Sequence, residues 1–499
     1  MKITLRIFSL ILVSVFLLSV VACSSVDSDD GKDKGDTSVT TAQQIEDPNG
    51  ISQLYRDLED SLPSLNFGGE TIRFLTLKNR GSTTGNVYDD EIWVDELTSE
   101  PLNDSIYNRN MYVMERLNCK IENELAVAAD LNKMLEKTHF ADEDVYQVVG
   151  FEAAPALNLG LDSYFYDLTN LETDYIDFDA PWWSGQFFES TNANGKIFAL
   201  AGSLSLSMAR SIYVTYFNKR IAEAYNVENL YTVTNDGLWT IDYQTQLVSG
   251  MYRDVNGNDT KDIEDEYGFC TPKYWSTDSY WSAFDIDILS RNEYGDFEFV
   301  LNSEKAYDGL LKIIALYYGE GAYHYSNTGD MFVSGNVFMT TQQISYAETP
   351  EFRNMQDDYG ILPMPKFDEK QSEYYSMPYE IFQTYSVPRT TARTDMATAV
   401  LEALCAETWR KIIPTYSELV LKGKYLNDPQ SRDMFDMIIS NTKIDAGIMY
   451  YIKISNIASA LYRYPIEIND PGNFSSELAS KSKNMKLFIK NLNELASKE

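Results

Sequence analysis

The chain has 499 residues, of which 44% are hydrophobic and 13% aromatic, enough apolar material for two or more domains with sizeable cores. Asp and Glu outnumber Lys and Arg by 75 to 41, and the formal net charge is -34. Because such a chain repels nucleic acid and anionic lipid, the composition argues against binding to phosphate backbones. The two histidines, His139 and His324, are too few for histidine-based metal chemistry and make a Ser-His-Asp triad a poor prospect. Cys119, Cys270 and Cys405 are far apart, which argues against a disulfide framework or a zinc site.

Residues 1–22 have the pattern of a secretion signal. Lys2 and Arg6 accompany an apolar run over residues 7–21, which is too short to be read as a membrane-spanning helix. The run ends at Ala22-Cys23, and small residues before such a cysteine are typical of bacterial lipoproteins, in which the cysteine becomes the first mature residue and carries lipid. The alternative is an ordinary signal followed by an incidental cysteine. We predict that Cys23 carries acyl chains such as palmitate and anchors the protein at the extracellular face of the cell membrane.

Residues 23–50 are expected to be a tether. The part that follows Cys23 is rich in Ser, Asp, Gly and Thr and contains no aromatic residue. It cannot bury enough apolar surface to fold, so it is predicted to link the lipid flexibly to the folded region.

Strands and helices alternate after the tether. The hydrophobic pattern predicts strands at 70–77, 119–122 and 145–150, with a helix starting at 102 and another over 129–138. A repeating strand–helix–strand order predicts a mostly parallel sheet.

Residues 211–269 carry the most informative series of motifs. A β-branched and aromatic strand, 212–217, ends at Asn218-Lys219 and leads into a helix. A second helix begins after Trp239, with Thr240 or Asp242 as its cap. An acidic loop follows, and the segment closes on Tyr267-Gly268-Phe269.

The order of these parts resembles the extracellular solute-binding proteins of ABC importers, in the carbohydrate group that includes the maltose-binding type. Members of that group have a strand ending in Asn-Lys, a Trp-led helix entry, an Asp-rich loop and then Tyr-Gly-Phe. The resemblance extends from about Glu70 to about Tyr451. It implies an α/β, two-lobed periplasmic-binding-protein-like (class II) fold with mostly parallel sheets, hinge crossings between the lobes and a helical C-terminal region.

The resemblance also implies where the lobes begin and end. Lobe one is expected to consist of 51–205 plus 338–386, and lobe two of 206–337 plus 387–499. The hinge is expected near 203–211, the return strand at 337–340 and the last crossing at 385–388. The helical remainder of the chain is expected to pack on lobe two.

The acidic loop 254–265 spaces its oxygen-bearing residues as a calcium loop does. It resembles EF-hand and dockerin loops, but Asp259 replaces the usual sixth-position Gly, and the last position is Asp instead of Glu. The alternative is a solvated acidic turn. The predicted ligands of a structural Ca²⁺ are Asp254, Asn256, Asn258, Thr260 through its carbonyl, Asp262 and Asp265.

A carbohydrate ligand would call for aromatic rings together with Asp, Glu, Asn or Arg side chains. Trp182 and Trp183 are either a sugar platform in lobe one or a buried pair, and the sequence weighs these equally. Trp281 either joins Tyr274 and Trp275 at a cleft rim or is buried in a helix. The expected ligand-binding residues are Arg80, Trp182, Trp183, Arg210, Tyr274, Trp275, Trp281, Glu348 and Tyr375.

These features predict a monomeric binding lipoprotein that captures an oligosaccharide and delivers it to the permease subunits of an ABC transporter. No catalytic residue and no catalytic cofactor are expected. A surface glycosidase or lyase is one rival, and it needs two carboxylates at a set separation. A sensing lipoprotein without a transporter is the other, and peptides or other polar solutes remain alternative ligands because one fold serves many substrates.

Overall fold

The computed structural model describes residues 58–78, 88, 91–273, 275–301, 304–324, 328–422, 429–454 and 456–495, with the backbone alone for residues 275, 328 and 418–422. The predicted signal, Cys23 and the tether lie outside the described residues. Within the described ranges, no helix combines the length and the apolar character needed to cross a lipid bilayer.

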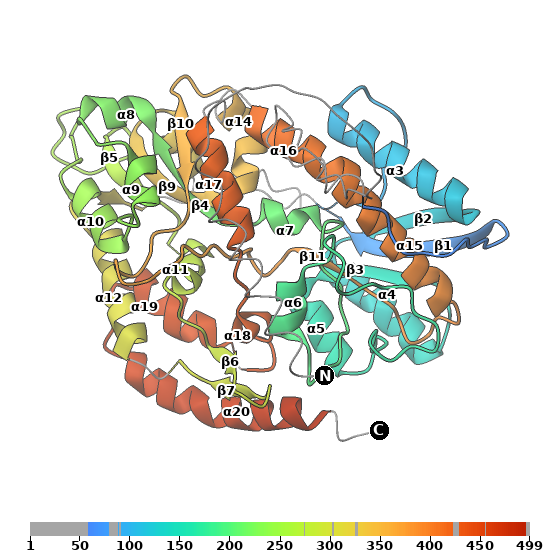
Figure 1. Ribbon diagram of the computed structural model, residues 1–499. Helices are drawn as coiled ribbons and strands as arrows, with labels where there is room; N and C mark the ends of the chain where they lie inside the picture. Colours follow the sequence, from blue (N-terminus) through green and yellow to red (C-terminus); the bar gives the residue numbers. More distant parts are fainter. Residues whose placement is uncertain are drawn as a thin grey trace, which may run out of the picture. The chain divides into compact units, whose positions relative to one another are not determined.

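A four-stranded sheet follows the predicted strand–helix–strand alternation (Figure 1). Its strands, in the spatial order β11-β3-β1-β2, are β1 (Glu70–Leu77), β2 (Cys119–Ala126), β3 (Val148–Glu152) and β11 (Gln383–Ser386). β1 is parallel to β2 and β3, and β11 runs antiparallel to β3. The helices α3 (Pro101–Leu117) and α4 (Ala128–Ala141) connect the parallel strands, and α5 (Ala153–Leu161) follows β3. We call this the first sheet.

A five-stranded sheet, the second sheet, is built around residues 211–269. Its strands, in the spatial order β10-β4-β9-β5-β8, are β4 (Tyr213–Asn218), β5 (Tyr267–Cys270), β8 (Ala322–Tyr323), β9 (Val337–Gln343) and β10 (Tyr359–Leu362). β5 is parallel to β8 and β9, whereas β4 is antiparallel to β9 and β10. The sheet is therefore mixed, where the sequence predicted mostly parallel pairing.

Three helices lie between β4 and β5, and the last of them begins at Thr240, one of its two expected caps. They are α8 (Lys219–Ala224), α9 (Leu230–Asn235) and α10 (Ile241–Ser249). The Asn218 side chain accepts the Ile221 N–H at 3.0 Å, and the Thr240 hydroxyl accepts the Tyr243 N–H at 3.2 Å. Both side chains satisfy a donor that the first turn of a helix leaves open.

The remaining elements before β11 are short except for α12. They are α6 (Gly185–Thr191), α7 (Leu206–Arg210), η1 (Trp275–Thr277), α11 (Asp278–Ala283), β6 (Leu289–Arg291), β7 (Phe297–Phe299), α12 (Glu304–Tyr317), α13 (Thr328–Val333), η2 (Ile344–Glu348) and α14 (Pro350–Arg353). β6 and β7 form a separate antiparallel pair.

The chain after β11 is helical, as predicted. Its helices are α15 (Thr394–Glu407), η3 (Thr408–Ile412), α16 (Ile413–Lys422), α17 (Pro429–Ser440), α18 (Ala446–Met449), η4 (Ser459–Arg463), α19 (Tyr464–Glu467) and α20 (Phe474–Glu494). α17 contacts β10 and α9, α19 contacts α12, and α20 contacts β7 and η4.

Two parts of the predicted lobe boundaries differ from the observed pairing. Residues 338–386 were expected in lobe one, but β9 and β10 belong to the second sheet and only β11 joins the first. Residues 387–499 were expected on lobe two, but α15 packs against α3, which belongs to the first sheet. In both cases the segment is buried on every side, so its hydrophobic pattern does not reveal its neighbour.

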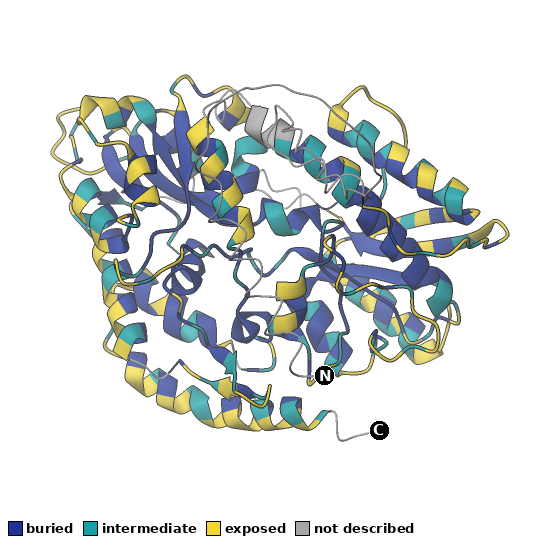
Figure 2. Cartoon of the chain, in the orientation of Figure 1, coloured by how far each residue is buried: buried dark blue, intermediate teal, exposed yellow. Residues whose placement is uncertain are grey.

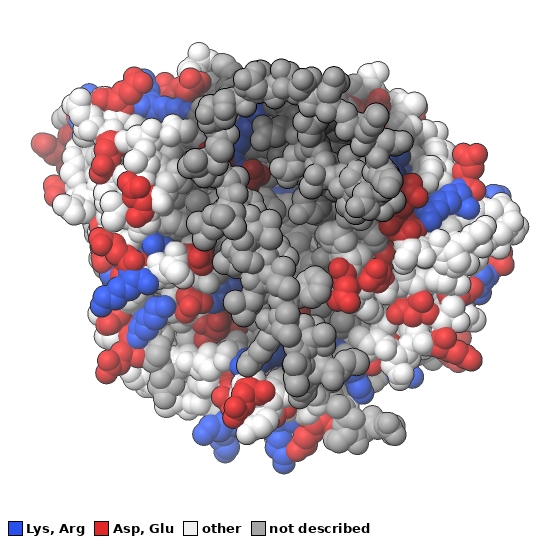
Figure 3. Space-filling model, in the orientation of Figure 1, with Lys and Arg blue, Asp and Glu red and all other residues white. Residues whose placement is uncertain are grey.

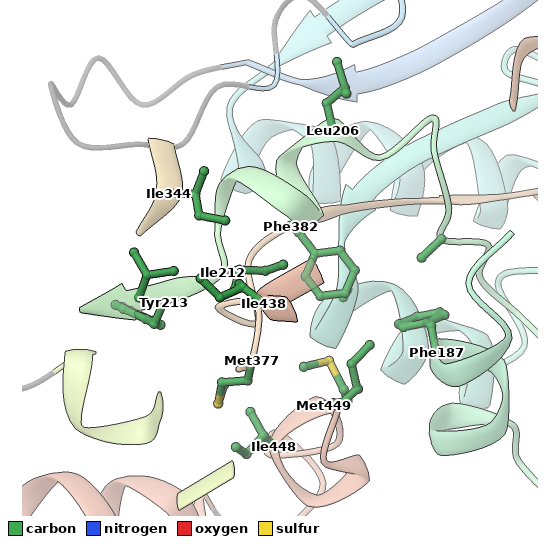
Figure 4. Packing of buried hydrophobic residues seen from close by; sticks show 14 of the residues in the cluster. Phe187, Leu206, Ile212, Tyr213, Ile344, Met377, Phe382, Ile438, Ile448 and Met449 are labelled. Carbon is green, nitrogen blue, oxygen red and sulfur yellow. The ribbon is translucent and has the colours of Figure 1, made fainter. Parts of the chain in front are cut away.

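Most strands of the two sheets are buried along most of their length, whereas β2, at the edge of the first sheet, is exposed at half of its positions (Figure 2). Apolar side chains from several elements also meet where the chain passes from one sheet to the other, among them Ile212, Tyr213, Met377, Phe382 and Met449 (Figure 4). The three cysteines Cys119, Cys270 and Cys405 are free thiols and buried, as the sequence indicated. On the face drawn in Figure 3, acidic and basic side chains are interspersed among uncharged ones.

Candidate functional site

Three stretches of chain lead from the elements of one sheet to those of the other, and we call them the crossing segments. The first is residues 201–212, which contains α7 and ends at β4; the second is residues 363–382, between β10 and β11. The third is η3 with α16. It links α15, which contacts α3 of the first sheet's connections, to α17, which contacts β10 of the second sheet. The first coincides with the hinge expected at 203–211. The crossing expected at 385–388 is displaced, because residues 383–386 are a strand of the first sheet.

Buried charged and aromatic side chains gather around Arg463, near the start of β4 in the second sheet. The Arg463 guanidinium donates through Nε to Asp278 at 2.9 and 3.1 Å and through Nη2 to Glu380 at 2.9 Å. Tyr213 at the start of β4 and Tyr379 from the second crossing segment lie beside these charges, with their ring centroids 6.1 Å apart. We call these five residues the Arg463 cluster.

Burial sets the electrostatics of the Arg463 cluster. Asp278 is fully buried, and Glu380 and Arg463 are nearly so. Burial raises the pKa of both carboxyls, and the Arg463 charge opposes the rise. Glu380 uses one oxygen for Arg463, while its Oε2 has no hydrogen-bond partner. A buried carboxylate oxygen without a donor is costly, so it is a position where a ligand hydroxyl group would be accepted.

A stacked aromatic pair adjoins the Arg463 cluster. The rings of Trp281 in α11 and Tyr462 in η4 lie 3.9 Å apart at an interplanar angle of 13°. Both rings are fully buried, as the sequence allowed for Trp281, and both the indole N–H and the phenol hydroxyl lack partners. Neither ring presents an open face in this structure, and what the pair offers a polar ligand is its two unpaired hydrogen-bonding groups.

Arg210 and Glu348, both predicted to bind the ligand, contact each other. The Arg210 guanidinium in α7 lies 3.2 Å from each Glu348 oxygen, and the Tyr416 hydroxyl of α16 donates to Glu348 at 2.7 Å. The Arg210 side chain is only 2% exposed. Glu348, in η2 after β9, is therefore joined to the first crossing segment through Arg210 and to the third through Tyr416.

Trp182 and Trp183 form the buried pair that the sequence had left open as an alternative. Their indole N–H groups donate to the two oxygens of Glu402 in α15, at 3.0 and 2.7 Å. Both rings are at most 5% exposed. Burial raises the pKa of Glu402 to about 7, and the hydrogen bonds from Trp183, Asp177 and Trp182 oppose the rise. In this structure the pair anchors α15 and presents no open ring face.

The other predicted ligand residues are not brought into one group. Tyr375 lies under the ammonium of Lys443, which is 5.1 Å from the ring centroid. Arg80 and Tyr274 lie outside the described residues, and only the backbone of Trp275 is described. Of the Arg463 cluster and its stacked pair, the sequence indicated only Trp281. The other members come from helices and loops with no motif of their own, so no sequence signal marked them.

The acidic loop is described in full and closes on itself through hydrogen bonds. Asp254 accepts the Gly257 and Asp259 N–H groups at 2.6 and 2.9 Å, and the amide nitrogens of Asn256 and Asn258 donate to Asp262 at 3.0 and 2.7 Å. Asp259 adopts a positive φ of 55°, the conformation its place in a calcium loop requires. Among the described residues, no three His, Cys, Asp or Glu side chains are gathered as metal ligands.

The comparisons with known proteins bear on the fold. No protein-family model and no curated sequence matches this chain. Among solved structures, a cyclo/maltodextrin-binding protein complexed with maltotetraose has a TM-score of 0.56 at 11% identity, over 84% of this chain and 97% of that one. An ABC substrate-binding protein from Listeria monocytogenes in complex with cycloalternan has a TM-score of 0.54 at 13% identity, over 84% and 99%. The maltose/maltodextrin-binding domain from Bdellovibrio bacteriovorus, bound to maltotriose, has a TM-score of 0.54 at 10% identity, over 84% and 100%.

The fold is thus the two-lobed, periplasmic-binding-protein-like fold of solute-binding proteins. The likeness to these three structures is one of fold, and it agrees with the fold predicted from the motifs of residues 211–269.

Proposed function

We propose that this protein is an extracellular lipoprotein, anchored through Cys23, that binds an oligosaccharide without changing it chemically and delivers it to an ABC permease. The Arg463 cluster carries the proposal. It gathers two carboxyls, a guanidinium and two tyrosine rings near the start of β4, with Glu380 Oε2 unpaired, and the adjoining Trp281 N–H is unpaired as well. Because these groups are buried, a ligand reaches them only when the crossing segments bend, which is how hinged binding proteins open.

Glu380→Gln is expected to separate binding from folding. Glutamine keeps the oxygen that Arg463 contacts. It replaces the unpaired carboxylate oxygen with an NH₂ group, which cannot accept a hydrogen bond from a ligand hydroxyl. We therefore expect affinity for the best-bound oligosaccharide to fall at least tenfold, while the unfolding free energy at pH 7 stays equal or rises. Calorimetric titration with maltooligosaccharides and other neutral oligosaccharides, together with urea unfolding, measures both.

The matched control is Glu373→Gln, an exposed carboxyl on the same crossing segment. It should leave affinity unchanged. Release of shorter sugars during the titration would support the rival enzyme. Failure of every oligosaccharide to bind the wild-type protein would contradict the proposed ligand class. If the protein binds an oligosaccharide but no permease gene lies beside its own gene, the sensing lipoprotein would be favoured.

We further propose that residues 254–265 bind a structural Ca²⁺. The donor set is all oxygen, as calcium prefers, and Asp259 supplies the positive φ that the loop needs at its sixth position. Asp265 is fully buried and accepts the Val255 and Asp262 N–H groups at 3.1 and 3.2 Å, so the end of the loop is already held in place. Binding requires the amides of Asn256 and Asn258 to turn their oxygens toward the ion.

Calcium is expected to raise the melting temperature by several degrees at millimolar concentration, because an ion that binds only the folded chain stabilises it by mass action. Asp254→Asn should abolish that rise while leaving the melting temperature in EDTA nearly unchanged. Differential scanning calorimetry with Ca²⁺, Mg²⁺ and EDTA tests this. Equal melting temperatures in Ca²⁺ and EDTA would identify the loop as a solvated acidic turn.

A further inference from the structure

The Glu91 carboxyl is fully buried and accepts hydrogen bonds from two elements, α7 and β11. Its Oε1 accepts the backbone N–H of Ser207 in α7. Its Oε2 accepts from the amide of Gln383 at 2.8 Å and from the hydroxyl of Tyr385 at 3.0 Å, both in β11. One side chain therefore ties the first crossing segment to the end of the second.

The surroundings of Glu91 fix the direction of these hydrogen bonds. The Gln383 amide cannot rotate freely, because its Oε1 accepts the Leu77 N–H at 2.9 Å, and this directs its NH₂ group at Glu91. The Gln383 N–H in turn donates to the Ser207 hydroxyl at 2.9 Å. All three neighbours present hydrogens to the carboxyl, so the arrangement suits a carboxylate, which only accepts.

The backbone around Glu91 is also connected to the third crossing segment. Arg109 in α3 donates to the carbonyl oxygens of Glu91 and Ile92 at 2.8 and 3.0 Å and to the Thr408 hydroxyl of η3 at 3.0 Å. At the other end of α7, Arg210 pairs with Glu348 near the second sheet. α7 is thus held at one end through Glu91 and at the other through Arg210.

We infer that Glu91 is the positioning residue of the first crossing segment: it fixes α7 against β11 and thereby tunes ligand affinity without touching the ligand. The effect on affinity rests on the proposed function, whereas the effect on α7 does not.

The charge state of Glu91 changes near neutral pH. Burial raises its pKa to about 7, against the lowering effects of Ser207, Arg210 and Tyr385. The charged groups near it are Arg109 and Arg210, and burial raises the pKa of Tyr385 well above its usual value. Opening α7 would expose Glu91 to water, return its pKa toward 4.5 and release a proton, so α7 should be held at least as firmly at pH 6 as at pH 8.

Amide hydrogen exchange of the ligand-free protein tests the positioning role directly. Glu91→Gln places an NH₂ group against the Gln383 NH₂, and we expect the amides of residues 206–212 to lose at least threefold in protection at pH 8. Tyr385→Phe removes one of the donors to the Glu91 carboxyl, so it should also lower the protection of these amides at pH 8. Glu122→Gln, an exposed carboxyl on β2, is the control and should leave that protection unchanged.

Oligosaccharide affinity measured at pH 8 completes the test. We expect Glu91→Gln to bind oligosaccharide roughly threefold to tenfold more weakly than the wild type at pH 8, where the wild-type carboxyl is ionised. Unchanged protection of α7 in Glu91→Gln would overturn the inference even if sugars bind. If no oligosaccharide binds the wild-type protein, the proposed function fails, and hydrogen exchange still decides whether Glu91 positions α7.

Discussion

Replacing Arg463 by methionine is expected to lower the free energy of unfolding by about 3–5 kcal/mol, because two buried carboxyls lose their cation. In the folded protein the guanidinium contacts both oxygens of Asp278 and one oxygen of Glu380. Asp278 is fully buried and Glu380 nearly so, so water cannot replace the lost donors without local opening. Urea unfolding at pH 7, analysed for midpoint and slope, measures the change.

The comparison variant is Arg253→Met. Arg253 forms an ion pair with Glu266 at 2.9 Å, but its side chain is 63% exposed, and exposed pairs contribute little. Adding Asp278→Asn and Glu380→Gln to Arg463→Met should restore much of the lost stability, since the cost lies in the uncompensated carboxyls. Equal midpoints for Arg463→Met and Arg253→Met would contradict this account of the cluster.

Stability is expected to fall as pH rises from 5 to 8. Burial raises the pKa of Glu91 and Glu402 from 4.5 to about 7. Between these values the folded protein holds protons that the unfolded chain has released, so each group's contribution is complete below pH 4.5 and is lost as pH passes 7. At roughly 1.4 kcal/mol for each pKa unit, the two groups together should lower the free energy of unfolding by several kcal/mol across this range. Melting temperatures across this range provide the measurement.

Glu402→Gln should flatten part of this pH dependence. Glutamine does not ionise, so the contribution of residue 402 becomes independent of pH. It offers one oxygen where Trp182 and Trp183 each need an acceptor, so the variant should be less stable than wild type at pH 5, with a smaller difference at pH 8. A wild-type melting temperature that rises steadily from pH 5 to 8 would contradict the raised pKa values of both carboxyls.

The candidate site shows where sequence reasoning reached its limit. Trp281 was expected either at a cleft rim with Tyr274 and Trp275 or buried in a helix, and the structure shows it buried in α11. Arg463 and Tyr462 lie nearly 200 residues further along, in a short helix without a motif, and they become neighbours of α11 only in the folded chain. Arg210 and Glu348 were both selected as separate ligand contacts, yet the structure pairs them with each other. Local pattern locates polar and aromatic residues but does not say which of them meet.

The sequence by itself determined the order of elements, Thr240 as one of two possible caps, and the fold class. These features depend on residues a few positions apart, so short stretches of the sequence are enough to predict them. Only the tertiary structure decided that β9 and β10 belong to the second sheet, that α15 packs on α3, and that Glu402 holds the two tryptophans. Segments buried on all sides carry no polar face to show their orientation, so their partners are chosen by packing and by hydrogen bonds between distant parts of the chain.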